Sequence, residues 1–185
     1  MHHANTLDLS RTALVVIDMQ ESFRPIISDF AETAARVALI AHAAHLLKLP
    51  VLVTEQYPKG LGATASEIRA VLPAGQEPIE KTAFSSCGAQ SFVSLLQQTG
   101  AQQILACGIE AHICVNQTTH DLLARGYQVH LLTDCITARA PENKELGLSK
   151  MQRAGALPSS TEMALFELLR DAQHEQFKAV QKLIK

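Results

Sequence analysis

Apolar runs of strand length alternate with helical patterns along the whole chain. The apolar runs cover residues 13–18, 50–55, 78–81, 103–108, 128–134 and, more weakly, 155–160. The first, second, fourth and fifth are rich in β-branched residues and leucine with little alternation, which is typical of strands buried on both faces of a parallel sheet. Helical patterns cover residues 29–49, 89–98, 113–125, 142–153, 162–170 and 173–184.

This alternation predicts a three-layer α/β fold, in which a six-stranded parallel sheet is flanked by helices and the crossovers are right-handed. A chain of 185 residues fits one domain, so residues 1–185 are expected to form a single unit. Asp29 is a candidate N-cap of the first long helix. Gly100 and Gly126 follow two later helical patterns as terminators.

Composition narrows the functional classes. The chain is 47% hydrophobic and 18% charged, so we expect disorder only in the first few residues, where His2 and His3 are either native or the remnant of a tag. A net charge of −2 offers no field that attracts nucleic acid or anionic lipid. The chain shows neither a membrane-spanning run nor a signal peptide, so we expect a cytoplasmic protein whose partners are small molecules or proteins.

Polar residues follow several of the predicted strands. In parallel sheets, ligands bind beyond the carboxyl ends of the strands, so side chains at those ends converge on one edge. Asp18, Lys81 and Cys114 come at or after the ends of the first, third and fourth strands. Glu55 and Asp134 also reach this edge, and we interpret them as caps or ion-pair partners.

Cys114 opens a helical pattern after an apolar strand and a glycine. Unpaired N–H groups at a helix start favour a thiolate and can lower the pKa of cysteine to about 3.5–7.5. We therefore expect Cys114 to be a nucleophile, whereas the commoner fate of cysteine is to be a small buried hydrophobe. That simpler interpretation fits Cys107 within a strand, and Cys87 is the weaker competitor. The four cysteines, Cys135 included, have no CxxC spacing, which indicates reduced thiols rather than disulfides or a zinc site.

A thiol needs a proton acceptor and donor nearby to cleave an amide. Asp18, at the end of a buried strand, can fill that role, although a helix cap or a metal ligand is the alternative. Lys81 can hold charges in place, although a solvated surface lysine is the alternative. His112 and His120 are expected to point away from Cys114 on a continuous helix.

Three segments, "ALVVIDMQESF", "EKTAFSS" and "ACGIEAHICVNQTTHDLLARGYQVHLLTDC", resemble the isochorismatase-like cysteine hydrolases over essentially the whole chain. The segments "TEQYPKGLG" and "HEQFKAVQKLIK" further resemble the small isochorismatase-domain-containing proteins of animals. The resemblance implies a Rossmann-like fold and a triad of Asp18, Lys81 and Cys114. It also implies a cis peptide bond between Ile109 and Glu110, with the N–H groups of Glu110 and Cys114 forming an oxyanion hole.

The sequence departs from two branches of this family. Nicotinamidases carry an Asp-x-His and a further histidine for a metal, but "TEQYPKGLG" has no histidine, so we predict no metal site and no cofactor. True isochorismatases have glycine in place of the cysteine, so Cys114 argues against hydrolysis of a vinyl ether. This chain resembles a subgroup without a settled substrate.

These observations favour a cysteine hydrolase that cleaves a small amide or related C–N bond through a covalent acyl-enzyme. A binding or scaffold protein that retains the fold is the alternative, and a thiol-redox role is the third. Residues expected to line a small apolar pocket are Gln20, Phe23, Tyr57, Phe84 and Ile113. The alanine-rich segment 31–47 predicts a homo-oligomer, and we interpret its histidines, His42 and His45, as surface or interface residues.

Overall fold

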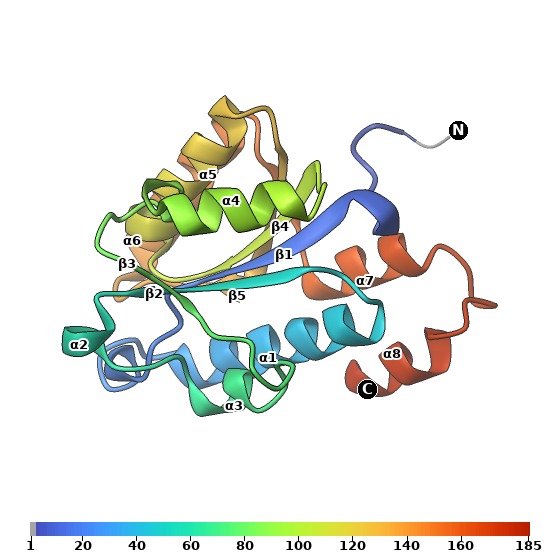
Figure 1. Cartoon of the computed structure of the whole chain (residues 1–185), viewed down its shortest axis with the longest axis horizontal. Coiled ribbons are helices and arrows are strands. Elements are labelled where there is room, and N and C mark those ends of the chain that lie inside the picture. The colour runs from blue at the N-terminus through green and yellow to red at the C-terminus, as the bar shows by residue number, and fades with distance from the viewer. Residues whose placement is uncertain (1–2) are drawn as a thin grey trace.

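The computed structural model describes residues 3–185 and contains a six-stranded parallel sheet (Figure 1). The strands are β1 (Thr12–Ile17), β2 (Val51–Gln56), β3 (Ile79–Lys81), β4 (Gln103–Gly108), β5 (Gln128–Ile136) and β6 (Leu157–Ser159). They lie in the order β3-β2-β1-β4-β5-β6, and every neighbouring pair is parallel. The predicted fold class is confirmed.

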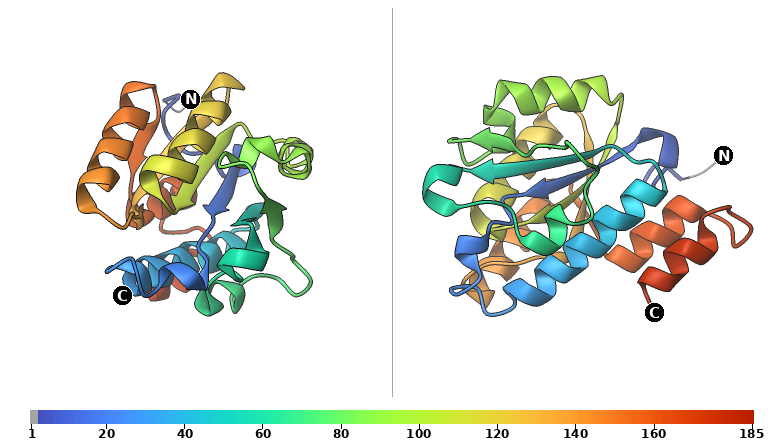
Figure 2. Two further views of the ribbon diagram at one scale, coloured as in Figure 1. Left: turned by 90° about the vertical axis from the view of Figure 1, so that its left-hand side faces the viewer. Right: turned by 60° about the horizontal axis from the view of Figure 1, so that its bottom comes forward.

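The helices are α1 (Phe30–Leu46), α2 (Pro58–Leu61), α3 (Ser66–Arg69), α4 (Gln90–Gln98), α5 (Asn116–Ala124), α6 (Pro141–Arg153), α7 (Thr161–Leu169) and α8 (Phe177–Leu183). Helices α4, α5 and α6 cover one face of the sheet, and α1, α3, α7 and α8 cover the other (Figures 1 and 2). A separate apolar core fills each space between sheet and helices. Every residue of β1 and β4 is buried, which explains why these strands are apolar beyond their first residues, Thr12 and Gln103.

Asp29 is the N-cap residue of α1 by position, as predicted, but its side chain makes no capping hydrogen bond. Its carboxylate instead accepts a hydrogen bond of 2.6 Å from the Thr137 hydroxyl. The helix predicted over residues 113–125 begins earlier, as a π-helical turn (Ala111–Val115), and continues into α5. The short helices α2 and α3 lack a long apolar repeat, and the sequence pattern did not reveal them.

The apolar face of α1 is covered by its own chain. Its buried residues pack with the sheet and with side chains of α3, α7 and α8. Packing within the chain therefore explains the apolar composition of α1, and this helix does not support the predicted self-association. His45 is exposed on the helix surface, and His42 is partly buried.

The N-terminal segment is tied to the sheet where it is described. The Gln128 side chain donates to the Ala4 carbonyl at 3.0 Å, and Gln103 donates to the Thr6 carbonyl at 3.0 Å. The expectation of disorder is wrong for these residues, and His2 lies outside the described part of the chain. Within residues 3–185, no helix is both long and apolar enough to cross a membrane.

Candidate active site

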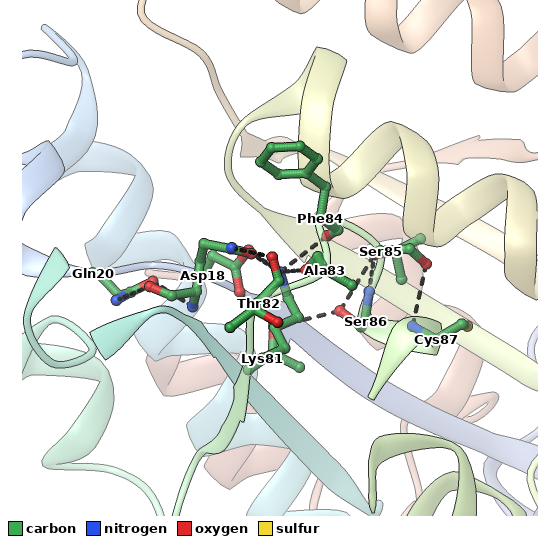
Figure 3. A network of polar contacts seen from close by, with 12 residues as sticks. Asp18, Gln20, Lys81, Thr82, Ala83, Phe84, Ser85, Ser86 and Cys87 are labelled. Atoms are coloured by element: carbon green, nitrogen blue, oxygen red, sulfur yellow. Dashed lines mark hydrogen bonds and ion pairs between the residues drawn. The ribbon is translucent and has the colours of Figure 1, made fainter. Parts of the chain in front are cut away.

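The predicted edge exists where β1 ends between β2 and β4. The connections from the strands of the sheet run in opposite directions on either side of this point, and such switch points form ligand crevices in α/β folds. Asp18 follows β1 with φ of +54°, a left-handed conformation that aspartate adopts more readily than most residues. Lys81 is the last residue of β3. The side chains of Asp18 and Lys81 meet at this edge of the sheet (Figure 3).

Lys81 and Asp18 form a buried ion pair. The Lys81 Nζ lies 2.6 Å from Asp18 Oδ2, and the two side chains are 0% and 2% exposed. Nζ also donates to Gln56 Oε1 at 2.7 Å and to the carbonyls of Ala83 and Phe84 at 3.2 and 3.0 Å (Figure 3). A buried charge is tolerated only when it is paired and hydrogen-bonded, and this ammonium meets both conditions. Lys81 is therefore not a solvated surface lysine.

Cys114 lies in the π-helical turn, not at an open helix start, and its thiol is buried. Burial, reinforced by the negative charge of Asp18, raises the pKa of Cys114 to about 12, although Lys81 acts in the opposite direction. The predicted lowering of the Cys114 pKa is thus wrong, because burial favours the neutral thiol. Any nucleophilic role for Cys114 therefore requires a neighbouring base.

Gly108 brings the end of β4 against the end of β1. It has φ of +121°, and a Cβ on it would lie 2.0 Å from the carbonyl oxygen of Ile17, the residue before Asp18. Only glycine permits this approach. The Ile109–Glu110 peptide that follows is cis, as the family resemblance implies.

Glu110 is fixed by a later part of the chain. Its carboxylate oxygen Oε1 accepts from the backbone N–H of Arg139 at 3.0 Å and from Arg139 Nε at 2.9 Å. Within residues 3–185, the backbone N–H of Glu110 donates to no other protein group. It therefore remains available to a ligand at the point where the cysteine-bearing turn begins.

Helix α6 supports this turn from behind. A Cβ on Gly147 would lie 2.8 Å from the carbonyl oxygen of Ala111 and 3.0 Å from the backbone nitrogen of His112. The helix therefore packs its backbone directly against the turn, because residue 147 has no side chain.

A cavity of about 110 Å³ opens beside Cys114. Its lining residues are Asp18, Phe23, Gln56, Leu61, Phe84, Ile109, Glu110, Ile113 and Cys114. The structure thus brings together the two residues Asp18 and Cys114 with three of the predicted pocket residues, Phe23, Phe84 and Ile113. Gln56 and Leu61 were missed as lining residues, because Leu61 lies on the unpredicted helix α2 and Gln56 had no assigned role.

Two predicted pocket residues lie elsewhere. Gln20 is fully buried and does not line the cavity; its amide donates to the carbonyls of Gln56 and Gly62 and accepts from the Gln56 N–H. Tyr57 is 54% exposed and lines a neighbouring cavity of about 600 Å³ together with Lys59 and Ala83. Lys81 also lines that cavity, but Cys114 does not.

The remaining candidates have structural contacts. Glu55 accepts from the N–H and hydroxyl of Thr64, both at 2.7 Å, and Asp134 accepts from the N–H of Thr161. Neither His112 nor His120 lines the cavity. All four cysteines are free, and Cys107 and Cys135 are fully buried. Burial raises the pKa of Cys87 as well. Over residues 3–185, no cluster of three or more His, Cys, Asp or Glu side chains could hold a metal ion.

Comparison with known proteins identifies relatives along nearly the full length. Residues 12–163 match the model of the isochorismatase domain. Isochorismatase domain-containing protein 2 of Homo sapiens is 40% identical over 174 residues, which cover 94% of this chain and 83% of the human protein. The corresponding protein of Danio rerio is 38% identical over 178 residues, covering 96% of this chain and 89% of its own.

Solved structures show the same similarity along nearly the full chain. A MAR1 ribonuclease from Caenorhabditis elegans is 36% identical with a TM-score of 0.92, covering 97% of this chain and 92% of that one. The YcaC gene product of Escherichia coli, described as an octameric hydrolase of unknown specificity, shares the fold at 20% identity with a TM-score of 0.91, covering 100% of this chain and 91% of that one. From its sequence, its sheet order and these relatives, the chain belongs to the isochorismatase domain family.

Proposed function

We propose that the protein is a cysteine hydrolase of a small amide or related C–N bond, with Cys114 as nucleophile, Asp18 as acid-base group and Lys81 as the fixed cation. The observation that carries this proposal is the buried Lys81–Asp18 pair, whose carboxylate lines the same small cavity as the Cys114 thiol. A fully buried ion pair is costly for stability alone, and acid-base chemistry gives it a reason to exist.

In the first half of the reaction, Asp18 accepts the thiol proton while the Cys114 sulfur attacks the amide carbonyl carbon. The carbonyl oxygen becomes an oxyanion, which the N–H groups of Glu110 and Cys114 stabilise. Asp18 returns the proton to the leaving nitrogen, the C–N bond breaks, and the acyl group stays on Cys114 as a thioester. The raised pKa of Cys114 makes the base indispensable for this step.

In the second half, Asp18 takes a proton from water as the water oxygen attacks the thioester carbonyl. The C–S bond then breaks, the sulfur regains a proton from Asp18, and a carboxylic acid leaves. Lys81 keeps its ion pair with the ionised carboxylate at both ends of the cycle and needs no change of its own charge.

The cavity favours a small uncharged substrate with a compact apolar acyl group. Most of its walls are apolar, and none of the described residues that line it is a lysine or arginine. The nearby cations Lys81 and Arg139 are already paired with the lining carboxylates of Asp18 and Glu110, so neither is free to bind an anionic group. A phosphodiester therefore fits poorly, although one solved relative is named a ribonuclease.

A binding or scaffold protein that retains the fold is the alternative function. A thiol-redox role is third: Cys107 and Cys135 pack in the other apolar core, away from Cys114, and burial raises the pKa of Cys87, which shares the core of Cys114. We propose no cofactor and no metal, because the oxygen-bearing side chains that line the cavity already have partners: Asp18 and Gln56 accept from Lys81, and Glu110 accepts from Arg139.

A screen of small amides tests the proposal. We expect slow turnover of short uncharged amides by the wild-type protein, no turnover by Cys114→Ala, and unchanged turnover after treatment with a chelator. Mass spectrometry should detect an acyl adduct on the Cys114 peptide. A short RNA belongs in the same screen. Amide binding without turnover would favour the binding function, and cleavage of RNA that survives in Cys114→Ala would contradict the proposal.

A further inference from the structure

We propose that Thr54 is a positioning residue for Asp18, and that two further buried hydroxyls, Ser86 and Thr118, link it to the helix that follows Cys114. This inference rests on the proposed hydrolase function. It assigns a role to residues that line no part of the Cys114 cavity and that sequence patterns did not single out.

Thr54 holds Asp18 through both backbone and side chain. It pairs in register with Ile17 on β1, and its carbonyl accepts from the Asp18 N–H at 3.1 Å. Its hydroxyl donates to Asp18 Oδ1 at 2.7 Å. Because Oδ2 is held by Lys81 at 2.6 Å, each carboxylate oxygen has its own fixed partner. Rotation of the carboxylate would break one of these two contacts.

The hydroxyls continue away from the site. Thr54 Oγ1 lies 3.5 Å from Ser86 Oγ, which accepts from the Thr118 hydroxyl at 3.3 Å. Thr118 Oγ1 in turn accepts from the backbone N–H of Ser86 at 2.9 Å. All three hydroxyl residues are fully buried, so water does not compete for these hydrogen bonds. The chain reaches from β2 through the segment after Lys81 (Figure 3) to α5.

The direction of these hydrogen bonds is fixed by charge. An ionised carboxylate only accepts, and each hydroxyl has one proton to donate. Thr54 donates its only hydroxyl proton to Asp18. Ser86 therefore donates to Thr54, and Thr118 donates to Ser86. This row of hydrogen bonds therefore provides one donor to Asp18 Oδ1 and fixes the orientation of the Thr54 hydroxyl.

Thr54→Val is the test variant, because valine keeps the shape of threonine and removes the hydroxyl. Misplacement of the base should lower kcat on the best amide of the screen by about 10- to 100-fold with little change in KM. Thr54→Ser, which restores the hydroxyl, should recover most of the loss, and Ser86→Ala should give an intermediate value. Thr119→Val is the matched control, because the buried Thr119 hydroxyl has no hydrogen-bond partner within the described residues.

A second measurement needs no substrate. The charge of Asp18 raises the pKa of Cys114, so a carboxylate that is no longer held in place should let the thiol ionise more readily. Alkylation of Cys114 by iodoacetamide at pH 8 should be at least about threefold faster in Thr54→Val than in wild type, and faster still in Asp18→Asn.

The outcomes separate the two proposals. If the wild-type protein hydrolyses no amide, the proposed function fails, and the alkylation rates still decide on Thr54. Wild-type kcat in Thr54→Val, or a Thr54→Ser variant as slow as Thr54→Val, would overturn the positioning role. An alkylation rate in Thr54→Val equal to that of wild type would overturn it too. Wild-type kcat in Ser86→Ala would overturn the extension beyond Thr54.

Discussion

The charges around Cys114 act on its thiol in opposite directions. Burial and Asp18 raise the pKa of Cys114, and Lys81 lowers it. Lys81→Met should therefore slow alkylation of Cys114 near neutral pH, whereas Asp18→Asn should accelerate it, each by roughly tenfold for a shift of about one pKa unit. Both variants should lose hydrolysis. The measurement is the alkylation rate as a function of pH, with circular dichroism to confirm folding.

General misfolding would move both rates the same way, so opposite shifts are specific to one charge cluster. Identical profiles in wild type and both folded variants would show that Cys114 acts alone. The binding or redox function would then be favoured.

The buried residue His130 links the stability of the fold to pH. His130 on β5 is almost fully buried, its Nε2 has no partner within residues 3–185, and burial lowers its pKa. The unfolded chain, with a histidine pKa of about 6.5, binds a proton that the folded protein resists. This contribution to stability is present above about pH 6.5 and is lost as the pH falls below it. His130→Leu should flatten the dependence.

Urea unfolding at pH 7.5 and pH 5 measures this effect, and His45→Leu on the surface of α1 is the matched control. An equal loss of stability on acidification in wild type and His130→Leu would assign the effect to other groups.

At the scale of elements, α6 holds the cysteine-bearing turn. An alanine in place of an exposed helix glycine usually stabilises a helix by about 1 kcal/mol. At Gly147 the added methyl group meets the backbone of Ala111 and His112, so Gly147→Ala should instead destabilise the protein by about 1–3 kcal/mol and lower turnover. Thermal unfolding and amide hydrolysis measure the two effects. Leu146→Ala, at an exposed position of α6, is the control.

A more stable and fully active Gly147→Ala protein would show that the turn tolerates displacement. A stability loss without any loss of turnover would show that α6 supports the fold but not the site.

The elements differ in how well the sequence predicts them. Strands β1 and β4 were predictable, because two-sided burial makes every residue after the first apolar or glycine, and Asp18 and Lys81 stand out where their strands end. The raised pKa of Cys114 could not be predicted from the sequence. A linear pattern does not distinguish a π-helical turn from a helix start, and it does not report how deeply a thiol is buried. Arg139 escaped notice because its contact with Glu110 joins segments far apart in the chain.

At the scale of the whole molecule, self-association remains a prediction. The surface that we expect to mediate it is on α7 and not on α1. Met163 and Phe166 lie one turn apart on α7 and are 54% and 42% exposed. Burying such an apolar face is a common reason for association. Light scattering at micromolar concentration should give a mass above 20.1 kDa, and the double variant Met163→Glu, Phe166→Glu should return it to that value. A wild-type mass of 20.1 kDa would contradict the prediction.

The strand order has a consequence for engineering. Strands β1–β3 form one side of the sheet and β4–β6 the other, so the seam between β1 and β4 divides the chain into two continuous halves. Asp18, Thr54 and Lys81 belong to the first half, and Glu110 and Cys114 to the second. The exposed turn at Gly100, with φ of +69°, lies between them. A chain split there would yield two inactive fragments whose complementation restores the site, which makes this fold a candidate reporter of proximity between two fused proteins.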